Sequence, residues 1–279
     1  APIEIRNAVY ERFLEHLPLY AKHRDDLHKR GLTDEAIHKN NYKSTILWDS
    51  TEGICNLLLK EGYPLKGVPG FYERDGKWTF MTLPGFLIPV RNSKNLIQGM
   101  QIRIDETFLR RKPDLQKYIW KSSAGKTNGV SSGSPVHIAM PSKPSVGSIV
   151  YITEGPLKAD IAAMYLDVPF IGIAGVGMYK QAVEVAVRMG AKTTPILFDM
   201  DKIDNEHVKA AEEKLIKELT DNKIKAFPIE WDVKLGKGID DVLVVRNESF
   251  KEFILDRVAE NVPVQTRIGN WVERFKNAI

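Results

Sequence analysis

The second half of this sequence alternates short apolar runs with segments of helical periodicity, and this alternation restricts the folds available to it. The runs IVYIT, PFIGIA, TPILF and KAFPIEW, at 149–153, 169–174, 194–198 and 225–231, each have about the length of a buried strand. Residues 205–221, between the last two runs, carry apolar side chains on one helical face and charges on the other. Strands alternating with helices predict an α/β fold with a mostly parallel sheet.

The first half is less regular and predicts an α+β subdomain. We expect helices near residues 5–17 and 33–40, and strands at 77–83, 86–92 and 96–105. The Gly- and Ser-rich segment at 122–134 predicts a mobile loop without regular structure.

The Pro- and Ser-containing stretch PSKPSVG predicts the boundary between the two halves. It lies at residues 141–147, so the first domain is expected to cover 1–147. A Rossmann-like domain is expected at 148–246, with a helix beginning at Asp240, and a C-terminal helical extension at 247–279.

The charges are unevenly distributed along the chain. Residues 1–147 carry 22 Lys and Arg against 15 Asp and Glu, whereas residues 148–279 carry 18 against 21. A basic half joined to an acidic half is typical of a polyanion-binding platform beside a metal site. Two ordinary solvated surfaces explain the charges equally well.

The sequence favours a cytoplasmic protein with no membrane partner. No apolar window approaches the roughly 20 residues that span a bilayer, and no secretory signal pattern is present. The single cysteine, Cys55, excludes an intrachain disulfide, and no Cys or His cluster has zinc-site spacing.

The triplet GKT at 125–127 has the ending of a phosphate-binding loop but not its spacing. Such a loop needs a glycine where this chain has Trp120, and a helix should follow where NGVSSGS stands. The triplet therefore does not predict a nucleotide-binding loop.

Acidic side chains follow three of the predicted strands. Glu154 ends the first, Asp199 and Asp201 follow the third, and Asp240 follows a GKG turn after the fourth. Acids at the carboxyl ends of parallel strands converge at one edge of the sheet, and Mg²⁺ is the cation that such oxygen ligands favour. Taken singly, Asp199 or Asp240 could instead cap a helix.

The order TEG (153–155), FDMD (198–201) and GKGIDD (236–241) resembles the Toprim domain shared by bacterial DnaG-type primases, topoisomerases and some nucleases. The match covers roughly residues 148–246. The resemblance implies that Glu154, Asp199, Asp201 and Asp240 bind Mg²⁺ or Mn²⁺, with Glu154, Asp199 and Asp201 as catalytic residues. Glu154 would complete the metal shell or act as general base.

Three segments of the first half are similar to the cores of DnaG-type primases. They are RGLTDEAIHKNNY (30–42), FLIPVRNSKNLIQGMQIRID (86–105) and KYIWKSS (117–123). The resemblance implies a basic ridge that binds nucleic acid and nucleotides through Arg91, Arg103, Lys117, Lys121 and Lys126. For any one of these residues, a solvated or packing role is at least as well supported.

Two positions depart from the primase pattern. Gly238 stands where primases usually carry an acid, and Lys158 occupies a position that is commonly acidic. Lys158 could pair with Glu154 one helical turn away, or it could contact a phosphate.

The resemblance implies a primase-like Toprim core that binds single-stranded DNA and makes short RNA primers from nucleoside triphosphates by metal-dependent nucleotidyl transfer. Replication of a plasmid, phage or mobile element is the expected setting, and a replicative helicase is a further expected partner. The alternatives are a Toprim nuclease and a single-stranded nucleic-acid-binding module that has lost catalysis.

Overall fold

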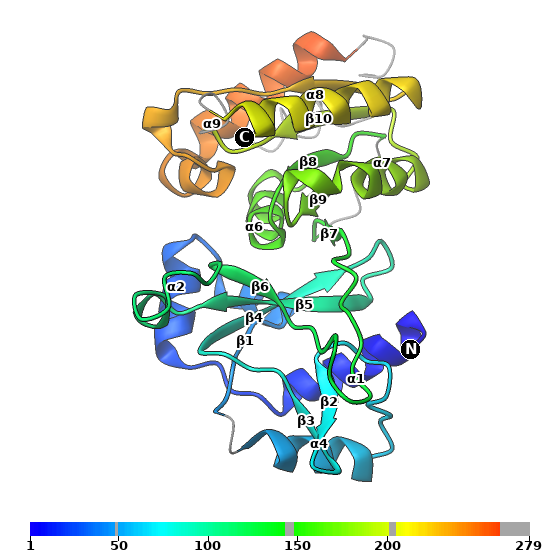
Figure 1. The fold of residues 1–279 in the computed structure, drawn as a ribbon. Coiled ribbons are helices and arrows are strands. Elements are labelled where there is room, and N and C mark those ends of the chain that lie inside the picture. Colours follow the sequence, from blue (N-terminus) through cyan, green and yellow to red (C-terminus); the bar gives the residue numbers. More distant parts are fainter. Residues whose placement is uncertain (48–49, 143–147, 201–204, 263–279) are drawn as a thin grey trace. The chain divides into compact units, whose positions relative to one another are not determined.

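The structure is a computed structural model, and it describes residues 1–47, 50–142, 148–200 and 205–262. The chain divides into two compact units, Ala1–Pro135 and Val136–Ile279 (Figure 1). The division precedes the expected boundary at 141–147, because the strand β7 (His137–Ala139) already belongs to the sheet of the second unit.

The N-terminal unit contains a four-stranded antiparallel sheet in the order β1-β4-β5-β6. These strands are β1 (Lys43–Ser44), β4 (Gly85–Arg91), β5 (Ile97–Ile104) and β6 (Tyr118–Trp120), and a hairpin pairs β2 (Phe71–Arg74) with β3 (Lys77–Phe80). The helices are α1 (Ile3–Glu15), α2 (Ala21–Lys29), α3 (Asp34–Asn40), α4 (Thr51–Lys60) and α5 (Glu106–Leu109).

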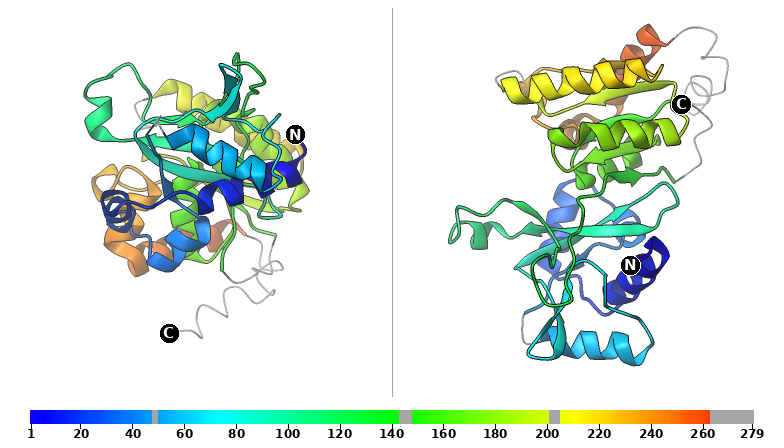
Figure 2. Two further views of the ribbon diagram at one scale, coloured as in Figure 1. Left: turned by 90° about the horizontal axis from the view of Figure 1, so that it is seen from below. Right: turned by 45° about the vertical axis from the view of Figure 1, so that its right-hand side comes forward.

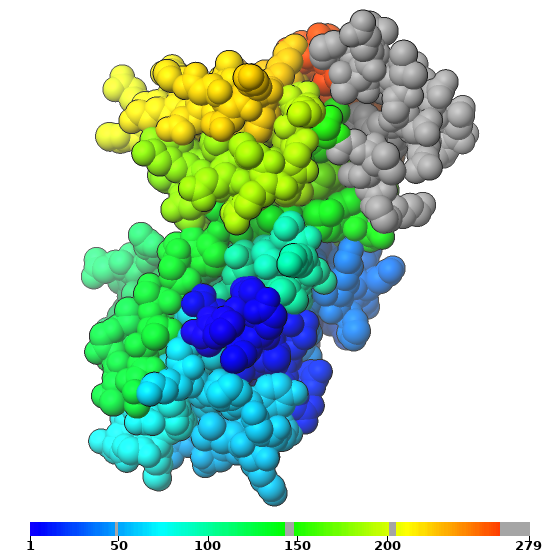
Figure 3. All heavy atoms as spheres, turned by 90° about the vertical axis from the view of Figure 1, so that its right-hand side faces the viewer, coloured from blue at the N-terminus to red at the C-terminus, as the bar shows by residue number. Residues whose placement is uncertain are grey.

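Aromatic side chains form the centre of the N-terminal core. Phe13 of α1 meets Phe71 and Phe80 of the hairpin edge-on, with ring centroids 5.3 and 4.8 Å apart. On the surface, α1 (dark blue) lies next to α4 (light blue) in Figure 3, and Arg12 Nε donates to Glu61 Oε2 at 2.8 Å. Buried aromatic contacts thus connect α1 to the β2–β3 hairpin, and an ion pair connects α1 to the end of α4.

The C-terminal unit contains a five-stranded sheet in the order β11-β10-β8-β9-β7. Four strands are parallel, and β7 runs antiparallel to β9 at one edge. The parallel strands are β8 (Tyr151–Glu154), β9 (Phe170–Ile173), β10 (Thr193–Leu197) and β11 (Lys225–Pro228). The sheet therefore has the mostly parallel character that the alternating sequence pattern predicts.

Helices cover both faces of this sheet (Figures 1 and 2). The helices α6 (Pro156–Leu166) and α9 (Ile239–Asn261) pack on one face, and α7 (Tyr179–Arg188) and α8 (Glu206–Asp221) pack on the other. Short 3₁₀ turns at Val176–Met178 and Val233–Leu235 connect these elements. The result is a three-layer α/β/α arrangement.

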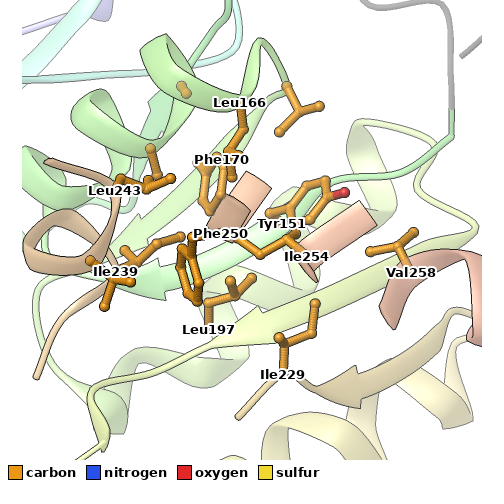
Figure 4. Close-up of a cluster of buried hydrophobic side chains, with 14 of the residues drawn as sticks. Tyr151, Leu166, Phe170, Leu197, Ile229, Ile239, Leu243, Phe250, Ile254 and Val258 are labelled. Carbon is orange, nitrogen blue, oxygen red and sulfur yellow. The ribbon is translucent and has the colours of Figure 1, made fainter. Parts of the chain in front are cut away.

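Alternation along the strands divides the apolar side chains between two cores. Tyr151 and Leu197 face α9, where Phe250 and Ile254 pack against them (Figure 4). Their neighbours Ile152 and Ile196 point to the α7 and α8 side. Burial on both faces explains why these strands read as continuous apolar runs.

The strand order creates a reversal point between β8 and β10. The helix α6 carries the chain from β8 to β9 on one side, whereas α7 carries it back past β8 to β10 on the other. In open α/β sheets, ligands bind beyond the carboxyl ends of the strands at such a reversal. Glu154 ends β8, and Asp199 lies two residues beyond the end of β10.

The fold class predicted from sequence is confirmed, with corrections to individual elements. Seven elements lie in segments where no element was expected: the helices α2, α4 and α5 and the strands β1, β2, β6 and β7. The predicted boundary at 246/247 falls inside α9, which runs through it with a kink at Arg246 (φ −132°, ψ 33°). Among the helices of the described residues, none is long and apolar enough to cross a membrane.

Candidate active site

Two of the predicted acids meet at the reversal point of the sheet. The backbone N–H of Asp199 donates to Oε1 of Glu154 at 3.3 Å, which joins the end of β8 to the segment after β10. The register of these neighbouring strands, Leu197 opposite Thr153, brings the two acids to the same edge. The side chain of Asp199 is mostly buried, with 11% of its surface exposed.

Asp240 reaches the same region from the first turn of α9. It is buried, with 3% of its surface exposed, and its carboxylate acts electrostatically on the Lys158 ammonium. The expected alternative, that Asp240 caps its helix, is not observed. Gly238 is the N-cap residue, and the backbone N–H of Gly238 donates to Oδ2 of Asp241 at 3.0 Å.

Lys158 is the basic residue at the centre of these acids. Its Nζ donates to Oδ2 of Asp199 at 2.6 Å and also hydrogen-bonds Oδ1 of the same carboxylate. Lys158 therefore pairs with Asp199. The spacing in sequence had suggested Glu154 as its partner. Burial by itself lowers the pKa of Lys158, but the nearby carboxylates of Asp199, Asp240 and Glu154 together raise it above its ordinary value.

A second lysine that sequence reasoning did not single out lies beside Asp199. Nζ of Lys237 is 3.9 Å from Oδ2 of Asp199, and more than half of the Lys237 side chain is exposed. It belongs to the GKG turn before α9, and its position between two glycines was the available signal. The edge thus combines three carboxylates with two ammonium groups.

The described residues do not fit a preformed divalent metal site. Carboxylates are the right donors for Mg²⁺, but both oxygens of Asp199 contact the Lys158 ammonium. Within 1–47, 50–142, 148–200 and 205–262, no group of three or more His, Cys, Asp or Glu side chains is arranged to hold a metal ion. Asp201 lies outside the described residues, so its predicted place in the metal shell stays a prediction.

Two of the predicted nucleic-acid contacts, Arg91 and Arg103, are buried in the sheet of the N-terminal unit. Arg91 donates to the carbonyl of Asn95 at 2.9 Å, within the hairpin that joins β4 to β5. Arg103 pairs with Asp26 at 2.8 Å and lies over the ring of Phe86. Both guanidinium groups have structural partners, which limits their availability to a phosphate.

Lys121 lies in the core of the N-terminal unit, where it cannot reach a phosphate. Only 1% of its surface is exposed, and its Nζ donates to the carbonyl of Met81 at 2.6 Å. The rings of Phe13, Phe71 and Phe80 surround this nitrogen at centroid distances of 4.9, 5.6 and 4.2 Å. Burial lowers the pKa of Lys121 to about 7. The structure contradicts the predicted nucleic-acid role of this residue.

Lys117 and Lys126 are the predicted contacts that remain accessible. Lys117 precedes β6 and pairs with Glu106 at 3.1 Å, with 45% of its side chain exposed. Lys126 is exposed in the Gly- and Ser-rich segment, which has no helix and only an isolated bridge, between Glu73 and Thr127. Their binding role stays a prediction.

Comparison of the sequence gives one family match. The family model described as a domain of unknown function, DUF3854, matches residues 144–250. This range includes all four parallel strands of the sheet, together with Lys158 and Gly238. A search of curated proteins found no match.

Solved structures similar to this chain include the cores of bacterial primases. The RNA polymerase domain of Mycobacterium tuberculosis primase DnaG, in complex with double-stranded DNA, gives a TM-score of 0.66 at 14% identity, covering 91% of this chain and 80% of that one. The E. coli primase catalytic core gives 0.57 at 14% identity, covering 96% and 87%. The zinc-binding and RNA polymerase domains of Aquifex aeolicus primase give a TM-score of 0.63 at 14% identity. That match covers 91% of this chain but only 60% of the Aquifex chain. This chain therefore has the fold of the DnaG primase catalytic core.

Proposed function

We propose that this chain is the catalytic core of a primase-like replication protein, which binds single-stranded DNA and joins ribonucleotides into short primers. The observation that carries the proposal is the contact between Glu154 and Asp199 at the reversal point of a sheet with the DnaG core fold. One of the similar structures, a DnaG primase catalytic domain, is bound to single-stranded DNA. We place the protein in the cytoplasm, in the replication of a plasmid, phage or other mobile element, with a replicative helicase as partner.

The chemistry of primer synthesis makes two demands on this edge of the sheet. A hydroxyl oxygen forms a bond to the α-phosphorus while the bond to pyrophosphate breaks, so a base must accept the hydroxyl proton and positive charge must offset the phosphates. Glu154 is the candidate base because it ends β8 beside Asp199. Lys158 and Lys237 place positive charge at the same edge. Mg²⁺ or Mn²⁺ is the cofactor that the primase resemblance implies.

An assay of the products tests this function. The purified chain is incubated with single-stranded DNA, labelled ribonucleotides and Mg²⁺ or Mn²⁺, and the products are separated by size. Short labelled products support a primase, whereas shortened DNA identifies a Toprim nuclease. Retarded but unchanged DNA identifies a binding module, and no product and no retardation contradict the proposal.

A second candidate function is single-stranded nucleic-acid binding without catalysis. The observation that favours it is the occupation of both Asp199 oxygens by Lys158. A carboxylate held by an ammonium group is a poorer ligand for a catalytic ion. The same assay separates this candidate from the primase, provided that DNA binding is measured in parallel.

A further inference from the structure

The contact between Lys158 and Asp199 spans two elements of the C-terminal unit. Lys158 lies in the first turn of α6, and Asp199 lies beyond the end of β10. The ammonium group hydrogen-bonds both carboxylate oxygens, and 24% of the lysine side chain is exposed. The carboxylates of Asp240 and Glu154 also act on it. Lys158 is therefore a cation held among the acids that the sequence assigned to a metal.

Gly238 provides the room for this lysine. Its backbone, with φ −98° and ψ 160°, lies in the ordinary extended region, so the conformation does not require glycine. A Cβ built on Gly238 would lie 2.5 Å from Oδ1 of Asp240 and 3.1 Å from both Cε and Nζ of Lys158. Any side chain at this position would crowd the lysine head and the Asp240 carboxylate.

The two departures from the primase pattern thus meet in one place. An ammonium group and a residue without a side chain lie against each other beside Asp199 and Asp240, and the missing side chain leaves space for the ammonium group. A positive charge fixed among these carboxylates reduces their attraction for a divalent cation. Lys237 adds a second positive charge 3.9 Å from the same carboxylate.

We propose that Lys158 is a tethered cation that takes the place of a divalent ion between Asp199 and Asp240, and that Gly238 is the residue that admits it. The proposal rests on the proposed function only in taking this edge as the reaction site. It predicts that the intact protein binds divalent ions weakly at this edge, and that removing the ammonium group strengthens the binding.

The test is Mn²⁺ binding without nucleotides or DNA, measured by electron paramagnetic resonance of free Mn²⁺. Lys158→Met keeps an unbranched side chain but removes the charge, so we expect Mn²⁺ affinity to rise by about tenfold or more. Lys217→Met is the matched control, because Lys217 donates to Asp221 at 2.6 Å on the exposed surface of α8. The control should leave Mn²⁺ affinity unchanged.

A second variant keeps the test decisive if Lys158→Met does not fold. Lys158→Gln also removes the charge but keeps a polar head that can donate to Asp199, so it should raise Mn²⁺ affinity in the same direction by a smaller factor. Circular dichroism establishes folding of each variant. Equal Mn²⁺ affinity in the intact protein and in every folded variant of Lys158 overturns the proposal.

The outcome is independent of primer synthesis. The measurement contains no DNA or nucleotide. It therefore decides whether Lys158 lowers Mn²⁺ affinity even if the protein has no primase activity. Conversely, primer synthesis with unchanged Mn²⁺ affinity in Lys158→Met would support the proposed function and reject the tethered cation.

Discussion

The backbone amide of Asp199 donates a hydrogen bond to the Glu154 carboxylate at 3.3 Å, although 44 residues separate the two in sequence. Each residue ends or follows a central strand of the parallel sheet, on either side of the point where the chain reverses direction. Parallel strands place their carboxyl ends at one edge, so the fold brings these acids together.

The buried amine of Lys121 should make stability depend on pH. Its pKa is lowered to about 7 in the folded state by burial, so between pH 7 and its ordinary value of 10.5 the unfolded chain binds more protons. The free energy of unfolding should therefore rise with pH across this window. The full cost of burying the charged ammonium group of Lys121 should be present below pH 7, and it should be lost as the pH rises toward 10.5. Lys121→Met should be more stable than the intact protein near pH 7, by a few kcal/mol, and the difference should shrink toward pH 10.

Urea unfolding of both proteins at several pH values measures this difference, and the variant serves as the reference for all other titrating groups. If the free energies of unfolding of the intact protein and of Lys121→Met change with pH in parallel, the three phenylalanine rings keep Lys121 protonated over the whole pH range. The predicted change in slope would then be wrong.

Gly70 should be intolerant of a side chain because Lys121 passes directly beside it. A Cβ on Gly70 would lie 2.6 Å from Cγ of Lys121, and its φ of +91° favours glycine. Gly70→Ala should lower the free energy of unfolding by about 2–4 kcal/mol, from strain and overpacking together. Gly76→Ala is the matched control: its φ is +74° with no atom within 4 Å of the added Cβ, so it should cost only about 1 kcal/mol. Equal losses would show that crowding at Lys121 contributes nothing.

The accessible lysines of the N-terminal unit should contribute to DNA affinity. Lys117→Glu and Lys126→Glu should each weaken binding of a single-stranded oligonucleotide by about three- to tenfold, with a shallower dependence on salt. Fluorescence anisotropy at fixed ionic strength measures the change. Lys217→Glu on the surface of α8 is the control for a general charge effect. If it weakens binding as much as the other two, no basic ridge is involved.

The parallel sheet was predictable from sequence because it is buried on both faces. Such strands read as continuous apolar runs, and the runs beginning at 149, 169, 194 and 225 correspond to β8, β9, β10 and β11. The strand β7 was missed because it has only three residues and pairs at the sheet edge. The helices α2 and α4 were missed in the less regular first half.

The site was predictable only as far as the topology determines it. Strand ends placed Glu154 and Asp199 together, but no local pattern indicates that Lys158 reaches Asp199 or that Gly238 makes room for it. The sequence placed Lys121 on a surface ridge instead of in the core for a similar reason. A lysine in KYIWKSS indicates a surface charge, whereas the rings around it come from residues 13, 71 and 80, far away in sequence.

The most direct test of the central claim compares primer synthesis by the intact protein with that of Glu154→Gln and Asp199→Asn. Both variants are close in shape to the natural residues, and Asp221→Asn on the exposed end of α8 is the control. We predict that each sheet-edge variant loses primer synthesis by about a hundredfold or more while remaining folded, and that the control retains it. Primer synthesis at the intact protein's rate in both sheet-edge variants would contradict the account.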